Sequence, residues 1–160
     1  MSAYPIKSFR SKPKYNISSR PCAPRNISIH YTGGKGSAKD NVIYFRGGDR
    51  QASADFFIDS SAIWRFNPHV GKYYTWAIGD GHGAYGYWNY DTIHIEVVSN
   101  GENFTKAEKR RLRYLVGVLM KRYNIPSSRV VRHYDCSRKL CPAPYIKARK
   151  WRKLHRYITS

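Results

Sequence analysis

The clearest alternation of apolar and polar residues lies at residues 92–98, which read Thr-Ile-His-Ile-Glu-Val-Val. In an extended segment the aliphatic side chains of this run fall on one face, and His94 and Glu96 fall on the other. Residues 27–31 show a shorter alternation that places His30 on the less apolar face. Both segments are therefore predicted to be half-buried β-strands with a histidine on the polar side.

Apolar residues at helical spacing predict three helices. Residues 38–46 follow a serine that can cap a helix, and two glycines end the pattern. The strongest prediction begins at the capping box formed by Thr105 and Glu108 and runs to about residue 123. A last helix is expected over about residues 144–157, with its lysines and arginines facing outward.

The remaining segments predict further short strands, a loop and an arm. Strands are expected at residues 55–58 and 62–66, joined by a turn of the sequence Asp-Ser-Ser, and a brief one near residue 130. Residues 67–90 are rich in glycine and aromatic side chains and predict a long loop, a kind of segment that is often functional. Residues 1–25 are rich in Pro, Ser, Lys and Arg and predict an irregular basic arm. The rest, residues 26–160, is expected to form a single domain.

The formal net charge of +19 is concentrated at the two ends of the chain. Residues 1–25 carry six basic and no acidic groups, residues 26–102 carry six and eight, and residues 103–160 carry seventeen and two. Such a field attracts polyanions, so nucleic acid, an anionic cell-wall polymer and a membrane surface are the candidate partners. No recognised nucleic-acid motif accompanies the charge, and specific nucleic-acid binding is not expected. A merely solvated surface is the alternative.

Composition excludes several classes of protein. Apolar residues make up 41% of the chain and aromatic residues 15%, which is enough for a packed core. No long apolar run predicts a transmembrane helix, and the first residues lack the apolar segment of a signal peptide, so synthesis in the cytoplasm is expected. The three cysteines, Cys22, Cys136 and Cys141, argue against a disulfide scaffold and leave metal binding or burial as their roles.

His30, His133 and Cys141 are the best candidate metal ligands in the sequence. Three protein ligands with a fourth position left to water is the arrangement of a catalytic zinc, whereas structural zinc usually has four. Lys139 would add a cation beside the metal, and Glu96 would add a carboxylate on the polar face of its strand. These five residues form the candidate site.

Other interpretations of the same residues remain open. A single histidine near a strand is more often a hydrogen-bonded core or surface residue than a ligand. The seven residues between His133 and Cys141 match no zinc-finger spacing, and Cys136 competes with Cys141 as the sulfur ligand.

Three motifs stand in a fixed order along the chain. They are His30-Tyr31-Thr32-Gly33, then Ile93-His94-Ile95-Glu96, and then His133-Tyr134-Asp135 followed by Lys139-Leu140-Cys141-Pro142-Ala143-Pro144. In this order the sequence resembles the zinc N-acetylmuramoyl-L-alanine amidases, the phage endolysin and bacterial autolysin enzymes related to peptidoglycan recognition proteins. The resemblance covers roughly residues 24–158 and favours Cys141 over Cys136 as the ligand.

The resemblance implies an α/β fold in which a central mixed β-sheet is flanked by helices and a groove on one face holds Zn²⁺. It implies that His30, His133 and Cys141 bind the zinc, that Glu96 is the catalytic carboxylate, and that Lys139 stabilises the oxyanion. Residues 26–160 would then be a catalytic domain without a separate wall-binding domain.

The activity implied is hydrolysis of the amide bond between N-acetylmuramic acid and L-alanine in peptidoglycan, with lysis or remodelling of the cell wall after release or export. The basic flanks would adhere to anionic wall polymers or to membrane. A non-catalytic peptidoglycan-binding module of the same fold is the alternative.

Two positions depart from the pattern of the family. Relatives often carry histidine where Asp55 stands and a small residue where His94 stands. Asp55, His94 and, in the glycine-rich loop, His82 are candidate substrate-binding residues. His94 could instead contact a metal ligand from behind, and a surface position is the alternative expectation for both histidines.

Overall fold

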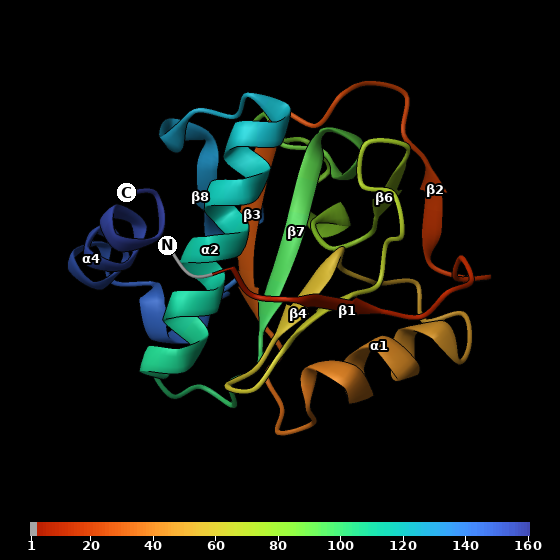
Figure 1. Ribbon diagram of the computed structural model, residues 1–160. Coiled ribbons are helices and arrows are strands. Elements are labelled where there is room, and N and C mark those ends of the chain that lie inside the picture. The colour runs from red at the N-terminus through yellow and green to blue at the C-terminus, as the bar shows by residue number, and fades with distance from the viewer. Residues whose placement is uncertain (1–2) are drawn as a thin grey trace.

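A six-stranded mixed sheet forms the centre of the computed structural model, which describes residues 3–160 (Figure 1). Its strands are β1 (Ile6–Ser8), β3 (Asn26–Tyr31), β4 (Phe56–Ile58), β5 (Ile63–Arg65), β7 (Thr92–Val97) and β8 (Val130–Arg132). They are ordered β1-β5-β4-β7-β3-β8, and only the β4–β5 pair is antiparallel. A separate antiparallel pair joins β2 (Ile17–Ser19) to β6 (Tyr73–Thr75). The α/β fold with a central mixed sheet is confirmed.

Four α-helices and four short 3₁₀ turns connect these strands. They are α1 (Ala38–Arg46), α2 (Lys106–Tyr123), α3 (His133–Ser137), α4 (Ala148–Ile158), η1 (Gly79–Gly81), η2 (Asn89–Asp91), η3 (Ser127–Arg129) and η4 (Ala143–Tyr145). The serine and threonine caps predicted for the first two helices are present, and both α1 and α2 begin with a capping box. No helix among the described residues is long and apolar enough to cross a membrane.

The helices divide between the two faces of the sheet because alternate strand residues point to opposite faces. Aliphatic residues such as Ile29 and Ile95 pack with α2 and α4 in the larger core, and Figure 1 shows α2 crossing this face. On the other face, Phe57 packs with α1, and Val131 packs with Cys136 of α3. This second face is the one on which the polar side chains of β3 and β7 lie.

The N-terminal segment is part of the fold, so the prediction of an irregular arm was wrong for residues 6–8 and 17–19. β1 pairs with β5 at the edge of the central sheet, and β2 pairs with β6. Between β2 and β3, the Arg20 guanidinium donates hydrogen bonds to the carbonyl oxygens of Val70, Tyr73, Tyr90 and Thr92. The sequence did not indicate these two strands because none of their residues is fully buried, so they show no apolar pattern.

Two other expectations differ in detail from the structure. The loop expected at residues 67–90 contains β6 and the turn η1, and the last helix begins at Ala148 because η4 occupies the preceding proline-containing segment. The short helix α3 was not predicted; it starts at His133 itself.

Candidate functional site

Two neighbouring parallel strands bring the first ligand and the carboxylate together. His30 of β3 and Glu96 of β7 are paired in the register of these strands, so their side chains leave the sheet on the same face. His30 Nδ1 lies 4.0 Å from Glu96 Oε1. The pairing follows from the two sequence alternations, each of which places its polar residue on the face that α2 does not cover.

The other two donors come from the far end of the chain. His133 is the first residue of α3, directly after β8, and Cys141 follows that helix. A backbone hydrogen bond from Tyr134 N to Cys141 O, 2.9 Å long, closes the segment and holds the cysteine beside the histidine. The predicted His-x7-Cys segment is thus a short helix followed by a return of the chain.

The three predicted ligands converge at one point. His30 Nδ1 lies 3.1 Å from His133 Nδ1 and 3.9 Å from Cys141 Sγ, and all three donor atoms lie within 4.8 Å of one another. All three side chains are buried. Burial lowers the pKa of both imidazoles, so they are neutral near pH 7 with free lone pairs, the form in which histidine binds metals.

Each imidazole is oriented through its second ring nitrogen. His133 Nε2 lies 2.9 Å from Asp80 Oδ1, and the other oxygen of that carboxylate accepts a hydrogen bond from Ser137. His30 Nε2 lies 3.3 Å from His94 Nδ1. In both cases an N–H on Nε2 leaves Nδ1 free to bind a cation, which is the usual way a protein fixes the tautomer of a metal-binding histidine.

Asp80 is the residue that sequence reasoning missed. It belongs to η1, and the following Gly81 lies so close to α3 that an added Cβ would be 2.5 Å from Cys136 O. This approach brings the Asp80 carboxylate to His133. The Gly-Asp-Gly-His-Gly sequence of the loop was the available signal, because a glycine at a close approach and an acid beside it suggest a tightly docked turn.

Glu96 is placed in an environment that disfavours its charge. Burial raises its pKa to about 8, while the nearby Lys139 opposes the shift. Its Oε2 has no hydrogen-bond partner among the described residues, although the atom is buried. Such an unpaired buried oxygen needs a partner, and the cavity next to it offers space for water or a ligand.

A cavity of about 280 Å³ opens onto the ligands. Its lining includes the three donors and Glu96, together with the exposed Lys139 and Leu140 and the half-buried Trp76. Trp76 also lines a neighbouring cavity of about 260 Å³, whose walls are largely aromatic and include His82. Trp76 is thus the residue that the linings of the two cavities share.

The three candidate substrate contacts have different positions. His82 is exposed and lines the aromatic cavity, so a substrate contact there stays a prediction. His94 and Asp55 are fully buried, so the expectation of a surface position for His94 was wrong. Asp55 Oδ2 accepts a hydrogen bond from the His94 backbone N–H, 2.7 Å long, and further bonds come from Asn67 and Thr75. Both residues therefore lie behind the ligands and not in the cavity.

Cys136 is not part of the ligand group. It is fully buried against Ile78 and Val131, and burial raises the pKa of its thiol to about 12. Cys141 remains the one sulfur that lies with both histidines.

Comparison with known families identifies the family to which this chain belongs. A family model described as N-acetylmuramoyl-L-alanine amidase matches residues 19–144, a span that includes every residue of the ligand group. The chain belongs to the N-acetylmuramoyl-L-alanine amidase family. Membership confirms the resemblance seen in the three motifs.

Curated amidases of Bacillus are similar over most of this chain. N-acetylmuramoyl-L-alanine amidase CwlA of Bacillus subtilis (strain 168) is 27% identical over 150 residues, which are 91% of this chain and 53% of CwlA. N-acetylmuramoyl-L-alanine amidase CwlH of the same organism is 32% identical over 123 residues, 75% of this chain and 48% of CwlH. The chain thus spans about half the length of the curated relatives it matches.

Solved structures share the fold. A mutant endolysin from Bacillus subtilis is 24% identical and superimposes with a TM-score of 0.82, covering 98% of this chain and 99% of that one. The catalytic domain of XlyA is 24% identical with a TM-score of 0.79, covering 96% and 99%. The fold described above is therefore that of an endolysin catalytic domain.

Proposed function

We propose that this protein is a zinc-dependent N-acetylmuramoyl-L-alanine amidase that hydrolyses the bond between N-acetylmuramic acid and L-alanine in peptidoglycan. The observation that carries the proposal is the convergence of His30, His133 and Cys141 beside the buried, unpaired Glu96 oxygen. Family membership supports the same bond as the point of cleavage.

The donor set fits zinc. Two ligands held about 2.1 Å from a tetrahedral ion lie roughly 3.4 Å apart, and the donor separations of 3.1 and 3.9 Å are close to that value. Two neutral imidazoles and one thiolate leave a fourth position open on the cavity side, as in catalytic sites. When bound, zinc supplies a Lewis acid that polarises the substrate carbonyl and lowers the pKa of water to about 7.

Glu96 would move the proton. Its carboxylate accepts a proton from the attacking water as the oxygen bonds to the carbonyl carbon, and returns it to the alanine nitrogen as the carbon–nitrogen bond breaks. A pKa raised by burial makes the protonated carboxyl a useful acid in the second step. A cation at the neighbouring ligands would lower that pKa again and favour the carboxylate in the first step.

Lys139 would stabilise the charge that forms on the carbonyl oxygen. It lines the cavity on the exposed side, and its charge acts on Glu96 and on both histidine ligands. A cation in that position meets an oxyanion without first having to be reoriented. His82 and the aromatic cavity beyond Trp76 would accommodate more distant parts of the glycan or peptide.

Digestion of purified peptidoglycan, with and without a zinc chelator, tests the proposal. We expect new L-alanine amino termini without new reducing sugars, as read by mass spectrometry of the fragments, and no products after chelation. New reducing sugars would contradict the assignment. Binding to peptidoglycan without any new ends would instead support the non-catalytic module.

A further inference from the structure

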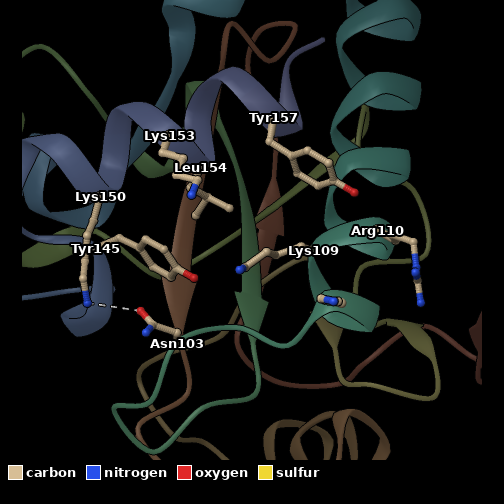
Figure 2. Close-up of a pocket in the computed structure, with 9 residues that line it drawn as sticks. Asn103, Lys109, Arg110, Tyr145, Lys150, Lys153, Leu154 and Tyr157 are labelled. Carbon is tan, nitrogen blue, oxygen red and sulfur yellow. Dashed lines mark hydrogen bonds between the residues drawn. The ribbon is translucent and has the colours of Figure 1, made fainter.

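A second groove lies between the first turns of α2 and the helix α4. Figure 2 shows Lys109 of α2 and Leu154 and Tyr157 of α4 pointing into the space between the two helices. Its volume is about 520 Å³, larger than that of the cavity at the metal ligands. The residues that line it are Asn103, Lys106, Lys109, Arg110, Tyr145, Lys150, Lys153, Leu154 and Tyr157. No part of the amidase chemistry described above uses this groove.

Five of these side chains are cationic and none is acidic. Within residues 3–160 none of the five forms an ion pair, and the polar contact of Lys150 is a 3.3 Å hydrogen bond to Asn103 Oδ1. The nearby Glu108 is buried and already accepts hydrogen bonds from Thr105 N and Ser60. Like charges around one hollow repel one another, and a bound polyanion would remove that repulsion.

The floor of the groove is apolar and recessed. Tyr145 and Leu154 are buried at its base, and Tyr157 is half-buried at its side. A surface with cations around a short apolar floor matches a chain in which phosphates alternate with small carbon units. We propose that this groove binds a linear polyol phosphate, the chemical class of the anionic polymers of cell walls.

Two other polyanions fit the groove less well. A bilayer is bound by apolar side chains that project from the surface, and none of the exposed large apolar residues, which are Tyr15, Ile43, Tyr44, Tyr85, Trp88, Val118 and Leu140, lines this groove. Single-stranded nucleic acid needs exposed aromatic faces for base stacking. Of the two tyrosines in the lining, Tyr145 is only 5% exposed, and the Arg113 guanidinium lies over the ring of Tyr157, 5.1 Å from its centroid.

The groove and the metal ligands lie on opposite faces of the sheet. Tyr145 and Leu154 belong to the core that contains Ile29 and Ile95, whereas His30 and Glu96 point the other way. A polymer in the groove would leave the catalytic face free. It would thus hold the domain at the wall and raise the local concentration of substrate, independently of the hydrolysis proposed above.

Matched triple variants test the groove against the overall charge of the protein. One carries Lys109→Gln, Lys150→Gln and Lys153→Gln; the control carries Lys7→Gln, Lys14→Gln and Lys121→Gln, which are exposed lysines away from the groove. Affinity for a fluorescent oligo(glycerol phosphate) is measured by anisotropy over a range of salt concentrations. Circular dichroism and turnover of a soluble muropeptide check that both variants are folded and active.

We expect the groove variant to bind the oligomer about 10-fold or more weakly at 0.15 M salt, with a shallower salt dependence, and the control to lose less than about 3-fold. Equal losses in the two variants would overturn the proposal. So would a groove-dependent loss that is as large for phosphatidylglycerol vesicles or for oligothymidylate as for the oligo(glycerol phosphate).

Discussion

Glu96 combines a half-buried side chain, a raised pKa and a buried oxygen without a hydrogen-bond partner among the described residues. Glu96→Gln keeps the shape of the side chain but cannot accept a proton. We expect turnover of a muropeptide to fall by about 10²- to 10⁴-fold, with bound zinc retained, because the carboxylate is not among the three donors. Product release and zinc content are measured on the same preparation. Turnover near that of the unchanged protein would mean that another group moves the proton.

His94 acts on the site through His30. Its Nδ1 is placed to accept a hydrogen bond from His30 Nε2, and its own backbone N–H is held by Asp55. We expect His94→Ala to weaken zinc binding by about 10- to 100-fold, since the His30 imidazole then loses the partner that orients it.

Competition with a chromophoric chelator measures this change without reference to activity. His94→Asn is the control, because its amide oxygen can accept the same hydrogen bond and should restore most of the affinity. If both variants bind zinc as tightly as the parent, the contact between the histidines does not position the ligand.

At the scale of elements, the docking of η1 against α3 sets the position of Asp80. Gly81→Ala would place a Cβ 2.5 Å from Cys136 O and push the turn away. We expect weaker zinc binding and a lower unfolding midpoint, because His133 then loses the carboxylate that orients it. Gly79→Ala is the matched control in the same turn, where the nearest atom is a side-chain nitrogen at 3.5 Å. If the two variants have the same zinc affinity and unfolding midpoint, the close contact between Gly81 and Cys136 O is not needed to position Asp80.

Asp59 connects the β4–β5 turn to the start of α1. Its carboxylate accepts hydrogen bonds from the backbone N–H groups of Ala38, Ser61 and Ala62, each 2.8 Å long. Burial alone would raise its pKa, but these bonds together lower it below the usual value. We expect Asp59→Ala to reduce the free energy of unfolding by about 1–2 kcal/mol at neutral pH.

The contribution of Asp59 to the free energy of unfolding should depend on pH in a defined direction. Because the pKa of Asp59 is lower in the folded state, its contribution is complete above the unfolded pKa of about 3.9 and is lost as the pH falls through the folded value. Urea unfolding at several pH values should therefore show the parent and Asp59→Ala converging in acid. A constant difference down to about pH 2 would contradict this account.

At the scale of the whole molecule, Arg20 ties the N-terminal segment to the segments that contain β6 and β7. Its guanidinium donates to four carbonyl oxygens on two stretches of the chain, residues 70–73 and 90–92, and burial lowers its pKa. Arg20→Met would remove all four bonds, although Tyr73 O also accepts a hydrogen bond from the Asn67 amide. We expect a loss of about 3 kcal/mol or more in the free energy of unfolding. Arg10→Met, an exposed position in the same segment, should change it by less than about 0.5 kcal/mol. Similar losses for both would argue against an anchoring role.

Sequence periodicity was sufficient wherever a segment buries one continuous face. The strands that carry His30 and Glu96 and the capped helices α1 and α2 were predicted because apolar spacing and caps are local signals. β1, β2 and β6 were missed because their residues are mostly exposed or half-buried and carry no apolar pattern, whereas β4, which is equally short, is buried along its whole length. Asp80 was missed for a related reason, since its contact with His133 joins residues 53 positions apart.

The pairing of His30 with Glu96 across β3 and β7 has a consequence for how this domain could be recombined or redesigned. Adding one residue inside either strand would turn every following side chain to the opposite face. Adding two residues would return these side chains to the original face but move them about 6.6 Å along the strand. Neither insertion keeps the separation of 4.0 Å between His30 Nδ1 and Glu96 Oε1. Chimeras of this domain should therefore be joined outside residues 26–31 and 92–97, where differences in length leave the spacing of the two strands intact.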